Sequence, residues 1–181
     1  QLGLTIPFFK YQNKSVKHSL ISIPLTYMGF AGYLNPITNE AQVNSLILKN
    51  SYPATLCHEI AHQIGYASES EANFLGFLGA VNAEDMHYKY SGYLMALRYC
   101  LFEVSRQNPE LFKNLKKEVN QGILKDMQKS QEFWNSYQNW SEKYFEIFYD
   151  SYLKANKQKE GIKSYNKMVG LIINYYQTTS L

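Results

Sequence analysis

The stretch SYPATLCHEIAHQIG, residues 51–65, decides how the chain is organised. Ser51 is a residue type that caps helices, Pro53 suits a first helical turn, and Gly65 suits the end of a helix. An apolar stripe recurs every four residues between them, at Leu56, Ile60 and Ile64. This spacing predicts a helix with one face turned toward a core.

The same stretch contains the pattern H-E-x-x-H, formed by His58, Glu59 and His62. Residues at i and i+4 project from one face of a helix, so both imidazoles can reach one tetrahedral metal ion. Glu59 lies one residue along, where its carboxylate can contact a water on the metal. The pattern predicts a zinc site, with Glu59 as the general base.

A catalytic zinc ion usually has three protein ligands, so a third one is expected. Glu69 and Glu71 follow shortly after Gly65 turns the chain. Ser68 and Glu71 match a capping box, which would occupy Glu71 and leave Glu69 as the predicted ligand. Asn73, one turn after Glu69, is predicted to accept a hydrogen bond from the second nitrogen of a ligand histidine.

The rest of the chain predicts an α+β fold that is mostly α. Residues 1–50 have the pattern of extended chain, with a hairpin in which 27–34 and 41–48 flank a polar turn, and Pro24 marks an edge or irregular strand. Helices are predicted from Ser68, over 85–106, from Asn108, over 131–156 and over 161–176. We expect residues 1–181 to form one domain, with 1–50 as its extended part and 51–181 as its helical part.

Composition excludes several classes of protein. A net charge of +3, with scattered Lys and Arg, gives no footprint for nucleic acid. Two cysteines, Cys57 and Cys100, are expected to be buried thiols rather than a disulfide framework. No run of about 18 apolar residues is present, so no membrane span is predicted. The first residue is Gln1, which suggests a piece cut from a longer protein.

H-E-x-x-H followed by the E-x-x-A-N string at 69–73 resembles the gluzincin metallopeptidases. Residues 58–74, and more loosely most of the chain, also resemble an uncharacterised bacterial domain-of-unknown-function family. In that family, hydrophobic N-terminal segments precede a zinc-peptidase-like domain. The resemblance implies a zincin-like metal helix between a small sheet and a helical bundle. Two departures are the short gap between His62 and Glu69 and an Asn at position 73, where an acid is more usual.

The resemblance also implies where further functional residues lie. Zinc peptidases usually add a group that stabilises the oxyanion. Tyr165 is preferred, because it falls in the family-like segment; the other candidates are His87, Tyr88, Tyr90, Tyr93 and Arg98. In many zincins an edge strand beside the metal helix pairs with the substrate backbone. Residues 41–46 are the natural candidate for that strand, with Ala41, Val43 and Asn44 as substrate-binding residues.

Two functions follow from these residues. The first is a membrane-anchored zinc metallopeptidase that holds one Zn²⁺ per chain and acts on a peptide or protein substrate. The second is a zinc-binding sensor or interaction domain without turnover. Glu59 favours the enzyme, because a purely structural zinc site needs no general base.

An aromatic stripe that includes Trp134 and Tyr137 predicts core packing or, alternatively, a groove for apolar substrate side chains.

Overall fold

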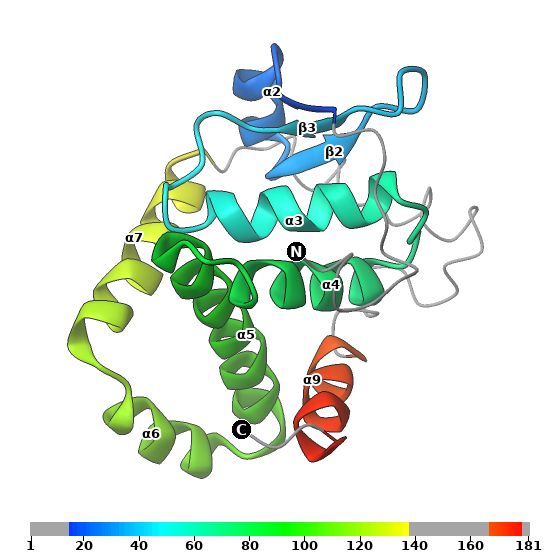
Figure 1. The fold of residues 1–181 in the computed structure, drawn as a ribbon. Helices are drawn as coiled ribbons and strands as arrows, with labels where there is room; N and C mark the ends of the chain where they lie inside the picture. Colours follow the sequence, from blue (N-terminus) through cyan, green and yellow to red (C-terminus); the bar gives the residue numbers. More distant parts are fainter. Residues whose placement is uncertain (1–14, 138–166, 179–181) are drawn as a thin grey trace.

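The computed structural model describes residues 15–137 and 167–178, and it confirms a mostly helical α+β fold (Figure 1). A small sheet lies near the N-terminus, and the helices follow it. In chain order the elements are β1 (Val16–His18), α2 (Ser22–Tyr27), β2 (Gly32–Leu34), β3 (Ala41–Val43), α3 (Tyr52–Gln63), α4 (Glu69–Val81), α5 (Met86–Gln107), α6 (Pro109–Glu118), α7 (Gln121–Tyr137) and α9 (Lys167–Thr178).

The predicted hairpin is present as β2 and β3, which pair antiparallel. Its turn depends on two asparagines. The side chain of Asn35 accepts hydrogen bonds from the backbone N–H groups of Ile37 and Thr38, and Asn39 has a positive φ of 54°. Asn tolerates this left-handed conformation better than most residues, which explains why the chain turns here.

The third strand corrects the predicted position of the sheet edge. β1 pairs parallel to β3, so the strand order is β1-β3-β2 and Ala41–Val43 forms the centre of the sheet. Ala41, Val43 and Asn44 are fully buried. The prediction that these residues form a free edge is wrong, because β1 and β2 already take up the backbone hydrogen bonds of β3 on its two sides, which leaves no free edge here for the predicted pairing with a substrate backbone.

The segment around Pro24 is also not the strand that its alternation predicted. Residues Ser22–Tyr27 form the short helix α2. The hydroxyl of Ser22 donates to the carbonyl of Ser19, and the hydroxyl of Thr26 donates to the carbonyl of Ser22. Pro24 lies in the first turn, where its missing N–H removes no intrahelical hydrogen bond.

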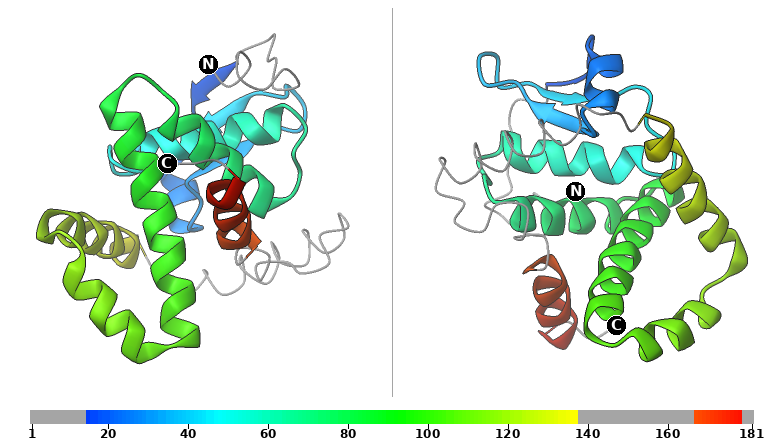
Figure 2. Two further views of the ribbon diagram at one scale, coloured as in Figure 1. Left: turned by 60° about the horizontal axis from the view of Figure 1, so that its bottom comes forward. Right: turned by 180° about the vertical axis from the view of Figure 1, so that it is seen from behind.

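Helix α3 lies between the sheet and α4 (Figures 1 and 2). Its contact with α4 is close, because a Cβ added to Gly76 would lie 3.0 Å from the backbone nitrogen of His58. The side chain of Gln63 connects the other end of α3 to the sheet region by donating to the carbonyls of Asn39 and Ser15. The buried side of α3 includes Ala54, Ala61 and the polar Glu59 and Gln63, whereas the predicted stripe of Leu56, Ile60 and Ile64 is only partly buried.

The start of α3 shows why a helix cap could not be assigned from local sequence. Ser51 occupies the N-cap position but makes no side-chain capping hydrogen bond. The hydroxyl of Ser91 on α5 accepts instead from the N–H of Ala54, at 3.0 Å. A residue 37 positions away therefore satisfies a free N–H in the first turn of α3.

The remaining helices agree in part with their predicted bounds. α5 begins one residue after Asp85, whose carboxylate accepts from the N–H of His87, and α6 begins after its N-cap Asn108. α7 starts ten residues earlier than the predicted 131–156 helix, and the part of that prediction beyond Tyr137 lies outside the described residues. No helix in the described ranges combines the length and apolar character needed to cross a bilayer.

Candidate metal centre

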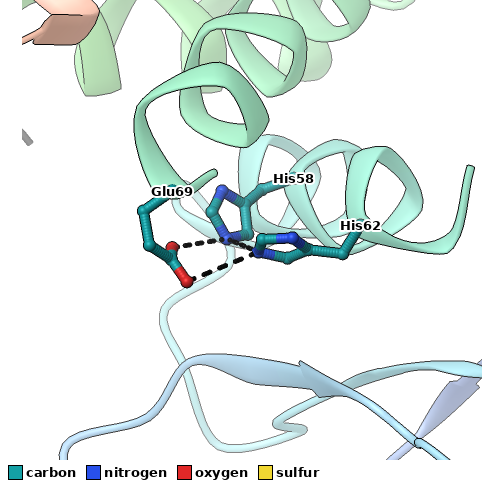
Figure 3. A group of neighbouring side chains, drawn as sticks. All are labelled: His58, His62 and Glu69. Carbon is teal, nitrogen blue, oxygen red and sulfur yellow. Dashed lines mark hydrogen bonds and ion pairs between the residues drawn. The ribbon is translucent and has the colours of Figure 1, made fainter. Parts of the chain in front are cut away.

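Three side chains from two helices converge at one point (Figure 3). α3 contributes His58 and His62, and the first residue of α4 contributes Glu69. The Nε2 atoms of the two histidines lie 3.0 Å apart. The carboxylate oxygens of Glu69 lie 3.5 Å from Nε2 of His58 and 3.6 Å from Nε2 of His62.

The turn between α3 and α4 brings Glu69 back to the histidines. Gly65 has φ +107°, a conformation that favours glycine, and the N–H of Tyr66 donates to the carbonyl of Ala61. Ser68 is then the N-cap of α4 but makes no side-chain capping bond. The predicted capping box is therefore not formed. Glu71 is exposed, whereas Glu69 is buried beside the histidines, so Glu69 is the carboxylate within metal-binding reach.

The three donor atoms fit a tetrahedral ion. With metal–ligand bonds of about 2.05 Å, two ligand atoms of a tetrahedral zinc site are separated by roughly 3.3 Å. The two Nε2 atoms are 3.0 Å apart, and each lies 3.5 or 3.6 Å from a different oxygen of Glu69, so the observed separations lie on both sides of that value. Two imidazole nitrogens and one carboxylate also form a donor set that zinc prefers in catalytic sites. A metal ion can be held here.

The second nitrogen of each histidine affects how well the ring can bind a metal. Nδ1 of His62 is 2.7 Å from the carbonyl of Tyr66, so it can donate there and leave Nε2 free for a metal. Asn73 was predicted to accept a hydrogen bond from the second nitrogen of a ligand histidine, and this hydrogen bond is not formed in the structure. Nδ1 of His58 and Nδ2 of Asn73 both lack hydrogen-bond partners among the described residues. If the side-chain amide of Asn73 is rotated by about 180°, its oxygen takes the place of Nδ2 and can accept a hydrogen bond from Nδ1–H of His58.

The electrostatic environment keeps His58 in its metal-binding form. Burial and the nearby His62 lower the pKa of His58 to about 4, although Glu69 and Asn73 act in the opposite direction. Burial also lowers the pKa of His62, but Glu69 and Glu59 outweigh it and the net pKa is raised. A neutral imidazole is the ligand form, so His58 needs to lose no proton to bind a metal at neutral pH.

Glu59 lies outside the donor set, packed against the sheet. It is only 4% exposed, and its Oε2 atom has no hydrogen-bond partner within the described part of the chain. Burial raises the pKa of Glu59 to about 8; His62 partly offsets this effect and Glu69 adds to it. A buried carboxyl group with a strongly raised pKa beside a metal-binding set is a common signature of an active site.

Gly32 of β2 makes the space that Glu59 occupies. A Cβ at position 32 would lie 2.5 Å from Oε1 and 2.8 Å from Cγ and Cδ of Glu59. No side chain larger than that of glycine fits there unless Glu59 moves. Sequence reasoning missed this contact, because the spacing between positions 32 and 59 carries no local signal.

The structure settles some of the other predicted residues and adds a new one. Tyr165 lies outside the described residues. Asn44 has a structural role, because its Nδ2 donates to Thr26 Oγ1 and to the Phe30 carbonyl at 2.8 and 3.0 Å. Tyr99 was not predicted; it is close to Asn73 and Glu69, and burial and Glu69 raise the pKa of its phenol. Because the chain has sixteen tyrosines, the sequence alone did not single out Tyr99.

Comparison with known proteins places the chain in a family. A family model described as "Protein of unknown function (DUF3810)" matches residues 1–173. The chain belongs to the DUF3810 family. No curated protein and no solved structure gives a match. The expected membership of a domain-of-unknown-function family is therefore confirmed, and the three-donor centre of this DUF3810 chain has to be interpreted from its own geometry.

Proposed function

We propose that this DUF3810 chain is a zinc-dependent metallopeptidase of the gluzincin kind, with one zinc ion held by His58, His62 and Glu69. The observation that carries the proposal is the buried Glu59 carboxyl group, which lies beside a three-donor set that it does not join. A site that serves only to hold metal has no use for such a carboxyl group. Burying a carboxyl oxygen that has no hydrogen-bond partner among the described residues, as Oε2 of Glu59 does, is costly, which supports a chemical role for Glu59.

The chemistry proposed for the site is hydrolysis of a peptide bond. A zinc ion held by the three donors would lower the pKa of a bound water toward about 7 and polarise the substrate carbonyl. The positive charge of the bound ion would also lower the pKa of Glu59 from its raised value and leave it ionised. Glu59 then accepts a proton from the attacking water, whose oxygen forms a bond to the carbonyl carbon. Glu59 then donates the proton to the leaving nitrogen as the C–N bond breaks, which gives a carboxylic acid and an amine.

The strand arrangement indicates which edge could pair with a peptide backbone. The N–H of Asn44 donates to the carbonyl of Ala31, and the N–H of Asn35 donates to the carbonyl of Glu40. In β2 and the residues that flank it, the backbone groups of the odd-numbered residues therefore face β3. The backbone groups of Gly32 and Leu34 therefore point away from β3. This edge of β2 lies beside Glu59, through Gly32. We assign substrate pairing to β2, in place of the central strand β3.

Two further parts of the proposal concern the partner and the cellular site. The substrate class is a peptide or protein that binds in extended form, since strand addition requires an extended backbone. Membrane association through segments outside this chain is a second proposal, based on the family resemblance. A fractionation experiment on the complete protein tests it.

The test of function is a comparison of three purified proteins. The unsubstituted chain should bind about one zinc, and His62→Ala should lose it. Glu59→Gln should keep the zinc and lose at least about 100-fold in peptide cleavage, because an amide cannot accept the proton. Equal cleavage by the unsubstituted and Glu59→Gln proteins would refute the role of Glu59. Zinc binding without cleavage by the unsubstituted chain would favour the sensor function.

A further inference from the structure

A cavity of about 100 Å³ is lined by residues of α3, α5 and α7 and by the chain that precedes β2. Its walls include Ala31, Thr55 and Arg98. On the α7 side they include Ser130, Phe133 and Trp134. A cavity of this size can hold several waters or a carboxylate with its adjoining methylene group.

Two separate chain segments connect this cavity to Glu59. Thr55 precedes Glu59 by four residues on α3, so both lie on one side of the helix, about 6 Å apart along its axis. Ala31 is the residue before Gly32, which is in contact with Glu59. An extended peptide advances about 3.4 Å per residue. The cavity is therefore one or two substrate residues from the bond that Glu59 would act on.

Arg98 is the charged group of this cavity. None of the described residues that line it is an Asp or a Glu. Nη1 of Arg98 contacts the buried hydroxyl of Ser130 at 3.3 Å, and in the described part of the chain no carboxylate forms an ion pair with it. Arg98 stays accessible to solvent, so a ligand can reach it. Guanidinium has five N–H donors in a planar fork that matches a carboxylate in bidentate geometry.

The two aromatic side chains suit the rest of such a ligand. Phe133 and Trp134 are partly buried, with their rings 5.0 Å apart, and both line the cavity. They offer apolar surface to methylene groups, while Arg98 and Ser130 offer donors to the charged end. Pockets that combine mostly apolar walls with a few placed polar groups are typical of specific ligand sites.

We propose that this cavity is a subsite that binds a substrate carboxylate through Arg98, one or two residues to the C-terminal side of the cleaved bond. The proposal rests on the proposed peptidase function. The side follows from β2, which runs from the cavity at Ala31 past Glu59 at Gly32. A peptide added antiparallel to β2 runs toward the cavity in its N-to-C direction. The carboxylate can come from an Asp or Glu side chain or from the substrate C-terminus.

The test combines cleavage with binding. A mixed peptide library, supplied with free and with amidated C-termini, is digested by the unsubstituted chain and by Arg98→Gln. We expect the unsubstituted chain to favour Asp or Glu over Asn or Gln, or a free over an amidated C-terminus, by about 10-fold or more at the first or second position after the cleaved bond. Arg98→Gln should lose that preference. Which pair of peptides shows it identifies the source of the carboxylate.

A binding measurement separates this proposal from the proposed function. Glu59→Gln protein is titrated with two fluorescent tetrapeptides that differ only in ending with Glu or Gln, both amidated. Tighter binding of the Glu peptide that disappears when Arg98→Gln is added supports the subsite, even if no cleavage is ever detected. Equal binding of both peptides, in this pair and in a matched pair with free and amidated C-termini, overturns it.

Matched variants control for general charge effects and for misfolding. Arg106→Gln removes a positive charge from the same helix, where Arg106 is exposed beside Glu103, and should leave the acid preference unchanged. An equal loss of preference in both Arg variants would overturn the subsite, because it would indicate long-range attraction alone. Arg98→Lys should restore part of the preference lost in Arg98→Gln, and unchanged zinc content in both shows that the centre is intact. A preference on the N-terminal side of the bond would overturn the antiparallel direction.

Discussion

The two acidic residues at the start of α4 allow a direct test of the metal centre. Glu69 and Glu71 are two residues apart in the first turn, yet Glu69 is buried at 3.5 and 3.6 Å from the histidine nitrogens and Glu71 is exposed. Glu69→Ala therefore removes one of three metal donors. Glu71→Ala removes only a surface charge from the same turn, which makes it a matched control.

The expected effect can be calculated from ligand linkage. Zinc at 1,000 times its dissociation constant stabilises the folded state by about 4.1 kcal/mol. Loss of an outer partner of a metal ligand weakens binding 10–100-fold, and loss of Glu69 itself should cost at least the upper end, about 100-fold. The same zinc then stabilises by only about 1.4 kcal/mol. For a chain of this length, about 2–4 °C per kcal/mol gives a zinc-induced rise in Tm of about 8–16 °C for the unsubstituted chain and about 3–6 °C for Glu69→Ala.

Thermal unfolding with and without zinc measures this difference, and chelator competition gives the dissociation constants. Glu71→Ala should lower Tm by about 1–3 °C in both conditions, because it loses a charge that favours the helix dipole. Its zinc-induced rise should equal that of the unsubstituted chain. If Glu71→Ala loses the zinc effect while Glu69→Ala keeps it, the assignment of the third donor is wrong, and so is the arrangement of α4 on α3.

Three further substitutions test the contacts that shape the centre. Gly32→Ala should lower peptide turnover at least about tenfold while zinc content stays unchanged, because the new Cβ would lie 2.5 Å from Oε1 of Glu59; an unaltered rate would contradict the contact. Gly76→Ala should cost about 1–3 kcal/mol in urea unfolding, since its Cβ would meet the His58 backbone at 3.0 Å; a loss below about 0.5 kcal/mol would show that α3 and α4 are not so closely packed. Asn44→Ala should destabilise by about 2 kcal/mol or more in the same assay, because it leaves the Leu46 N–H and the Phe30 carbonyl without their buried partner; near-neutral behaviour would argue against that role.

Local patterns in the sequence predicted several parts of the molecule correctly. The spacing of His58 and His62 places both side chains on one face of a helix wherever that helix lies, because i and i+4 always coincide. The hairpin turn and the start of α5 were also readable, since Asn35, Asn39 and Asp85 act through hydrogen bonds and dihedral angles within four residues. Such interactions do not depend on the rest of the fold.

Other features depended on segments that are distant in the chain. β1 pairs with β3, and this long-range pairing turned the expected edge strand into the centre of the sheet. Ser91 satisfies the N–H of Ala54 in place of the expected local cap Ser51. Helix α2 formed where the alternation of Ile21 and Ile23 predicted a strand, because local hydroxyl bonds and a proline in the first turn favour a helix there.

The sequence by itself determined the residue types that can bind a metal, the helix that carries two of them and the position of Glu59 beside them, because a metal motif is a property of residue identity and helical period. Only the tertiary structure decided between Glu69 and Glu71, set Gly32 against Glu59, and gathered Ala31, Thr55 and Arg98 around one cavity. The physical reason is the same in each case. Burial and contact between helices and strands are fixed by packing of the whole chain, and residues far apart in sequence carry no periodic signal of their meeting.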